Sequence, residues 1–210
     1  MRLVVTQRSL RWILRWTQRL LFASGVSVLA YCGLVLVDAW TFQKGEERQL
    51  ERLLTERQQA DTGARQTAPP TPREKSSPAV THGLIGRIDI PRLGLSAIVI
   101  EGTSRATLRR ALGHIPGTAL PGMPGNVGIS GHRDTYFRPL RNIRQGDIIT
   151  FTTALGEYRY RVVSTQVVDP HDVAVLDPSG DEILTLVTCY PFYFVGSAPD
   201  RFIVRAERVA

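Results

Sequence analysis

Eighteen consecutive residues, from Leu20 to Val37, carry no charged side chain. A helix of that length measures about 27 Å, close to the ~30 Å thickness of the hydrocarbon core of a bilayer. Trp16 and Trp40 flank the stretch at positions that suit the two membrane–water interfaces. The stretch therefore predicts a single N-terminal transmembrane helix, a signal-anchor, over residues 20–40.

The formal net charge of +7 is concentrated before this helix. The first nineteen residues contain five arginines and no acidic residue, which accounts for +5 of the total. The remaining chain is nearly neutral, so we expect no nucleic-acid partner. Positive flanks favour the cytoplasmic side, which predicts a cytoplasmic tail at 1–19 and an extracytoplasmic C-terminal part. A cleaved signal peptide is the alternative, but no small-x-small cleavage site follows the apolar stretch.

Residues 41–80 are expected to connect the membrane to a folded domain. Helix formers dominate 43–60, where Leu50, Leu53 and Leu54 form a short apolar stripe, and this predicts a juxtamembrane stalk helix. Residues 61–80 are rich in threonine, proline, serine and charged residues and have few apolar side chains to bury. Such a composition predicts an extended tether.

A compact, mostly β domain is predicted at 81–210. Short apolar runs recur with glycine or proline turn signals every ten residues or so, which is typical of a closed β-barrel or a sandwich. A short helix is expected at 103–112, with Thr103 or Ser104 as its N-cap. The predicted strands are residues 84–90, 95–100, 126–132, 148–152, 158–163, 184–188 and 202–209.

The chain has two cysteines, and the predicted topology separates them. Cys32 lies in the membrane span and Cys189 in the exported domain. A lone exported thiol indicates an intermolecular disulfide, an inert buried side chain or a reactive group. Cys189 ends one strand-like run, His132 ends another and Arg201 opens a third, so all three side chains stand at strand ends.

These three residue types together predict acyl transfer through a thioester. A thiolate is a nucleophile, and a nearby imidazole or guanidinium favours the anion. Histidine carries protons near pH 7, and arginine directs a fork of donors at an oxyanion. A membrane-tethered binding module with an unreactive thiol is the non-catalytic alternative.

The residues around this set resemble a known family, the sortases, which are membrane-anchored cysteine transpeptidases. Residues 185–189 read T-L-V-T-C, which matches the family motif T-L-x-T-C, and Arg201 follows about a dozen residues later. His132 occupies the family's histidine position in S-G-H-R-D. The flanking Y-P-F and the upstream T-A-L-P-G are most similar to class D, and the resemblance covers residues 81–210.

The resemblance implies an eight-stranded sortase β-barrel in which His132, Cys189 and Arg201 are catalytic. It implies cleavage of an LPxT-like sorting signal and transfer to an amine of a cell-wall peptide or pilin, without a cofactor. Thr188, His114 and Tyr190 are candidates for substrate binding. The Thr188 hydroxyl is equally suited to a hydrogen bond with a backbone group of a strand. His114 is also suited to shaping the wall of the groove.

Other residues and families fit less well. One exported cysteine and scattered histidines are a poor zinc set, so no metal is expected. His82 and His171 are most simply exposed, and Asp134 is suited either to orienting His132 or to capping a helix. L,D-transpeptidases place histidine and glycine directly before the cysteine, and papain-like hydrolases place the cysteine before the histidine.

Overall fold

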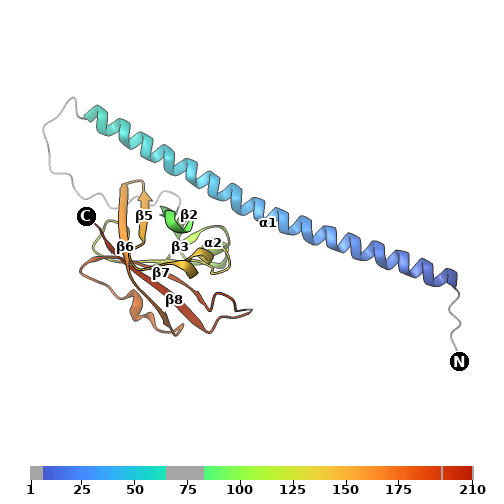
Figure 1. The fold of residues 1–210 in the computed structure, drawn as a ribbon. Helices are drawn as coiled ribbons and strands as arrows, with labels where there is room; N and C mark the ends of the chain where they lie inside the picture. The colour runs from blue at the N-terminus through green and yellow to red at the C-terminus, as the bar shows by residue number, and fades with distance from the viewer. Residues whose placement is uncertain (1–6, 65–82, 195, 210) are drawn as a thin grey trace. The chain divides into compact units, whose positions relative to one another are not determined.

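The computed structural model describes residues 7–64, 83–194 and 196–209, and it contains a long helix and a β-barrel (Figure 1). The chain divides into two compact units, residues 1–41 and 42–210. His82 and residues 65–80 of the predicted tether lie outside the described residues.

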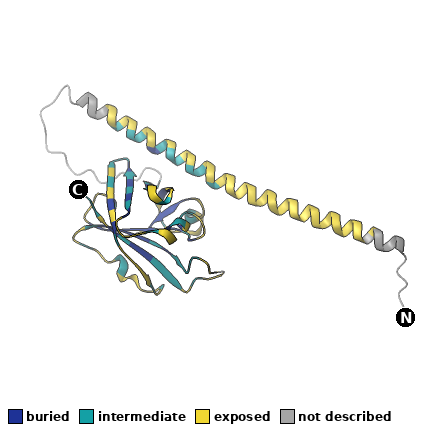
Figure 2. Cartoon of the chain, viewed as in Figure 1, coloured by how far each residue is buried: buried dark blue, intermediate teal, exposed yellow. Residues whose placement is uncertain are grey.

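Helix α1 (Gln7–Ala64) is 58 residues long. It contains no proline, so nothing in its sequence removes a backbone hydrogen bond along its length. Its side chains from residue 14 to 38 are exposed, and Figure 2 shows this stretch of the helix in continuous yellow. By length and composition the helix can cross a membrane. The predicted transmembrane span and the predicted stalk are therefore parts of one helix.

The segment of α1 after residue 42 packs on the barrel instead of standing free as a stalk. Leu50 is only 2% exposed and forms an apolar cluster with Leu84 and Ile98. The side chain of Gln43 accepts a hydrogen bond from the Ile98 backbone N–H (3.0 Å). The compact unit thus begins near Phe42, whereas the sequence predicted a domain starting at 81.

A chain beginning at residue 81 is expected to be less stable than one beginning at residue 42. It loses the Leu50 side chain, whose full burial contributes about 2 kcal/mol. For a domain of this size that loss lowers Tm by roughly 5 °C. Thermal unfolding of the two chains measures the difference. Leu50→Ala in the longer chain should reproduce most of it, and Arg48→Ala, at an exposed position on the same helix, should not. Equal Tm values for the two chains would contradict the packing role.

Eight strands among the described residues close into a barrel in the order β1-β2-β3-β4-β7-β8-β6-β5. Short helices connect them: α2 (Arg105–Arg110) and the 3-10 helices η1 (Pro91–Leu93), η2 (Arg138–Asn142) and η3 (Val173–Leu176). The strands are β1 (Leu84–Ile90), β2 (Leu95–Glu101), β3 (Leu112–His114), β4 (Gly125–Ser130), β5 (Ile148–Thr153), β6 (Gly156–Val168), β7 (Glu182–Tyr190) and β8 (Asp200–Arg208).

The predicted fold class is confirmed: the domain is a closed barrel and not a sandwich. Alternating side chains of the strands fill its interior, with Ile88, Phe151 and Leu184 fully buried. Several local predictions differ from the structure. β4 ends at Ser130, two residues before the predicted end at His132, and β6 continues to Val168, beyond the predicted end at residue 163. Helix α2 is shorter than expected, although Ser104 caps it by accepting from the Thr107 N–H (3.1 Å). The three-residue strand β3 was not among the predicted strands, and its first residue, Leu112, was expected to end the helix.

Candidate active site

Three neighbouring strands bring the predicted catalytic residues to one edge of the barrel. β4 and β7 are parallel, with Ser130 opposite Val187, so both strands end at the same edge. β8 runs antiparallel to β7, and its first residues therefore lie at that edge too. His132 follows the end of β4, Cys189 lies near the end of β7, and Arg201 near the start of β8.

Cys189 and Arg201 are direct partners across the β7–β8 pair. Side chains of directly opposed residues in antiparallel strands project from the same face with Cβ atoms about 5 Å apart. Cys189, His132 and Arg201 are all half-buried and line one pocket of about 260 Å³. The remaining lining comes from Arg133 and Asp134, which follow the histidine, and from Gly196, Ser197 and Ala198 between β7 and β8.

Thr188 connects the cysteine strand to the histidine segment. Its side chain is 2% exposed, and its hydroxyl donates to the Gly131 carbonyl (2.8 Å). Gly131 itself has no room for a side chain, because a Cβ there would lie 2.6 Å from Leu112 and 2.7 Å from Phe137. The Thr188 hydroxyl therefore forms a hydrogen bond with a backbone carbonyl, which was one of its two predicted roles. This bond fixes the residue that precedes His132.

Thr188→Val is expected to lower stability by about 1–2 kcal/mol because it leaves the buried Gly131 carbonyl without this donor. Turnover should also fall, since the carbonyl lies one residue before His132. Thr188→Ser keeps the hydroxyl and serves as the matched control. Urea unfolding and peptide turnover are measured on both variants. A valine variant as stable and active as the serine variant would show that the hydrogen bond positions nothing.

His114 and Tyr190, the other substrate-binding candidates, lie outside the lining of the pocket. His114 is 3% exposed, with Nδ1 2.8 Å from a Glu101 carboxylate oxygen and Nε2 2.9 Å from the Ala119 carbonyl. Side chains alternate along a strand, so Tyr190 projects from the opposite face of β7 to Cys189. Its ring stacks on Phe202 at 6.2 Å, and both rings contact Phe192.

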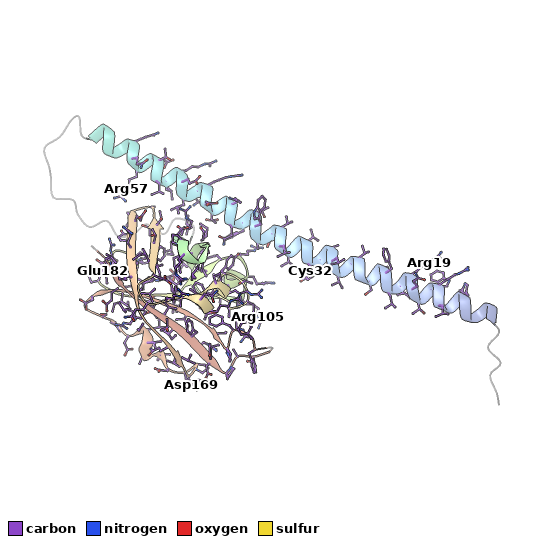
Figure 3. The ribbon with its side chains drawn as sticks, viewed as in Figure 1. Arg19, Cys32, Arg57, Arg105, Asp169 and Glu182 are labelled. Atoms are coloured by element: carbon purple, nitrogen blue, oxygen red, sulfur yellow. The ribbon has the colours of Figure 1, made fainter. Side chains whose placement is uncertain are left out.

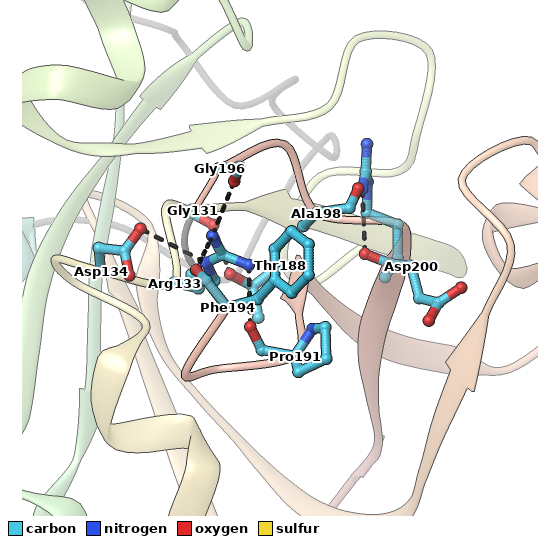
Figure 4. A network of polar contacts seen from close by, with 10 residues as sticks. Gly131, Arg133, Asp134, Thr188, Pro191, Phe194, Gly196, Ala198 and Asp200 are labelled. Atoms are coloured by element: carbon cyan, nitrogen blue, oxygen red, sulfur yellow. Dashed lines mark hydrogen bonds and ion pairs between the residues drawn. The ribbon is translucent and has the colours of Figure 1, made fainter.

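The charged groups beside the pocket have defined partners. Arg201 Nη1 donates to the carbonyls of Asp200 (3.0 Å) and Ala198 (3.4 Å), which holds the guanidinium against the segment between β7 and β8. The carboxylate of Asp134 lies 3.4 Å from Nε of Arg133 (Figure 4). Asp134 does not cap η2, whose N-cap is Phe137 without a side-chain hydrogen bond, and its ion pair is with the adjacent arginine.

Neither Cys32 nor His171 belongs to the lining of this pocket. Cys32 is a free, exposed thiol on α1 (Figure 3). The His171 side chain is 95% exposed, as predicted, and its backbone and ring nitrogens lower the pKa of Asp169 by hydrogen bonding. Within residues 7–64, 83–194 and 196–209, no group of three or more His, Cys, Asp or Glu side chains is placed to hold a metal ion.

Arg133 also lines the pocket, although the sequence analysis assigned no role to it. It stands directly after His132 in the family-like motif, and its side chain is 6% exposed. An arginine just beyond a strand end is normally a solvated residue, so its position alone did not indicate burial. The only available signal was its adjacency to the histidine.

Comparison with known proteins agrees with this architecture. The profile of the Sortase domain family matches residues 88–209. Sortase D of Bacillus subtilis (strain 168) is 31% identical over 191 residues, covering 90% of this chain and 96% of the relative. The Clostridium perfringens sortase D5 transpeptidase shares the fold, with a TM-score of 0.64 at 24% identity over 81% of this chain and 99% of that chain.

A third comparison covers a smaller share of this chain. Sortase C2 of Group B Streptococcus pilus island 1 has a TM-score of 0.57 and 31% identity, over 62% of this chain and 76% of that chain. The closed barrel and its cysteine pocket define a β-barrel cysteine enzyme. The chain belongs to the sortase family of cysteine transpeptidases, which act on sorting-signal proteins and amine acceptors.

Proposed function

We propose that this protein cleaves an LPxT-like sorting signal through a thioester on Cys189 and transfers the acyl group to an amine of a cell-wall peptide or a pilin. The observation that supports this most strongly is the single pocket lined by Cys189, His132 and Arg201. Three unlike chemical groups from separate parts of the chain meet there, and each is suited to one step of acyl transfer.

In the first step the Cys189 thiolate attacks the carbonyl carbon of the threonine residue in the signal. The carbonyl oxygen becomes an oxyanion, and Arg201 donates hydrogen bonds to it. Protonated His132 gives its proton to the departing amine as the C–N bond breaks, which leaves a thioester. The position of Arg201 directly opposite Cys189 in the β7–β8 pair supports this role.

In the second step an acceptor amine attacks the thioester. His132, now neutral, takes a proton from the amine, and the thiolate leaves as the new amide bond forms. Thr188 and Gly131 support this exchange indirectly, because their hydrogen bond fixes the chain immediately before the imidazole.

Transfer of a sorting peptide to an amine tests this function. Full-length protein in detergent is incubated with LPxTG and LPxTA peptides and with a glycine peptide or a lysine-containing peptide as acceptor. The expected products are the released C-terminal fragment and the peptide–acceptor amide, detected by mass spectrometry. A scrambled peptide is the control. Intact sorting peptides after long incubation, with the fold verified, would overturn the proposal.

We propose further that α1 anchors the enzyme in the cell membrane as a single pass, with its N-terminus in the cytoplasm and the barrel outside. The arginines before the apolar stretch support this orientation. Proteinase added to intact spheroplasts is expected to digest the barrel, while a cytoplasmic marker protein stays intact. A protected barrel that is digested only after lysis would reverse the orientation.

A further inference from the structure

Arg133 is a buried cation with an unusual set of partners. Its only ion pair among the described residues is with Asp134, at 3.4 Å, and the Asp134 side chain is 71% exposed. Burying a guanidinium is unfavourable unless hydrogen bonds replace its water. Here backbone carbonyls do so, because Arg133 donates to the oxygens of Pro191 (2.8 Å), Phe194 (2.7 Å) and Gly196 (3.1 Å).

All three carbonyls belong to the segment that joins β7 to β8, between Cys189 and Arg201 (Figure 4). Nη1 bonds the start of this segment at Pro191, and Nη2 bonds its middle at Phe194 and Gly196. Gly196 has a φ of 106°, a region that favours glycine. One planar side chain thus binds several points of this segment, whose described residues, 191–194 and 196–199, form no helix or strand.

The same segment also holds Arg201. Its guanidinium donates to Ala198 and Asp200, a few residues beyond the last carbonyl bound by Arg133. Residues 196–198 form one part of the pocket lining, and His132 to Asp134 form another. Arg133 therefore joins the two parts, and a continuous chain of contacts runs from the residue after His132 to Arg201.

We propose that Arg133 is a positioning residue that sets the spacing of His132 and Arg201 around Cys189 by tying the chain after His132 to the β7–β8 segment. This inference rests on the proposed function of the pocket. The N–H groups of Arg133 donate to backbone carbonyls of the protein, so Arg133 acts on the reaction through the residues that it holds. Misplacing catalytic groups by about 1 Å costs on the order of 100-fold in rate.

Arg133→Lys tests the proposal because it keeps the charge and removes the planar fork. An ammonium is a single donor centre and cannot serve carbonyls that two separate nitrogens now bind. In steady-state cleavage of a sorting peptide by full-length protein in detergent, we expect kcat to fall at least about tenfold and KM to change by less than about threefold. Such a split indicates misplaced catalytic groups and not weakened substrate binding.

Two matched variants separate positioning from stability. Arg138→Lys changes an exposed arginine of the same region and should leave kcat near the wild-type value. Ile149→Val removes a methylene from a fully buried side chain in β5 and lowers Tm without touching the segment. If Ile149→Val lowers kcat as much as Arg133→Lys does at the same loss of Tm, the effect is one of stability and the proposal fails.

Chymotrypsin supplies a readout that is independent of substrate. Tyr193 and Phe194 lie in the segment and are exposed, so their cleavage rate reports how firmly the segment is held. We expect cleavage there to be about tenfold faster in Arg133→Ala than in wild type or Arg138→Ala. Equal cleavage rates in Arg133→Ala and wild type would show that Arg133 does not hold the segment. Faster cleavage of Arg133→Ala with an unchanged kcat would contradict the positioning role. A wild-type protein without turnover would instead contradict the proposed function, and the cleavage rates would still decide whether Arg133 holds the segment.

Discussion

Cys189→Ala is expected to abolish both cleavage of the sorting peptide and its transfer to an amine, while the barrel remains folded. The proposed reaction passes through a bond to the Cys189 sulfur, and alanine offers no atom that could form it. Removing the nucleophile from a cooperating set costs on the order of 10⁶-fold in kcat, because the remaining groups have nothing to activate. The side chain is half-buried at the pocket, so its loss creates no large core cavity.

The other cysteine provides the control for this experiment. Cys32 is exposed on α1, and Cys32→Ala should keep full activity. Peptide turnover and circular dichroism are measured on both variants and on the wild type. A thiol-directed alkylator should likewise inactivate wild type and Cys32→Ala to the same extent. Turnover retained by a folded Cys189→Ala protein would exclude Cys189 as the nucleophile.

Arg201→Lys is expected to be severely impaired although it preserves the positive charge. Its proposed task is geometric, because a planar fork must place donors on an oxyanion that exists only in the transition state. Loss of one oxyanion donor typically costs about 100- to 1000-fold in kcat, or roughly 3–4 kcal/mol. Lysine also cannot reproduce the bonds from Arg201 to the carbonyls of Ala198 and Asp200, which hold the guanidinium beside the pocket.

Arg205→Lys is the matched control, since Arg205 lies on the same strand and faces Thr185 rather than Cys189. We expect kcat/KM of Arg205→Lys to stay within about twofold of the wild-type value, as for most surface substitutions. Near-wild-type values for both variants would show that Arg201 merely begins a strand.

The parts of this structure that sequence predicted are those with a strong local signal. β1 was predicted at 84–90 and begins and ends at those residues, because its apolar run is bounded by glycine and proline. The meeting of His132, Cys189 and Arg201 followed from strand ends and from the T-L-x-T-C resemblance, and the structure places all three at one pocket. Their chemical roles stay predictions until the variants are measured.

The parts that sequence did not predict depend on tertiary contacts. β3 is three residues long, too short for a periodic pattern, and it exists because β2 and β4 pair with its two edges. The leucine stripe of α1 was visible in the sequence, but nothing there indicated that Leu50 would pack on Ile98. Arg133 depends on carbonyls about sixty residues away, and a backbone acceptor has no sequence signature.

The most direct test of the central claim is the mass of the enzyme itself during turnover. Full-length protein is mixed with an LPxT-type peptide in the absence of an acceptor amine, quenched in acid and digested. The proposed mechanism predicts a peptide fragment of residues around Cys189 that carries the acyl group of the signal up to its threonine, and loss of that mass after an amine is added. An acyl group on any other residue, or peptide cleavage by a protein whose Cys189 is never acylated, would contradict it.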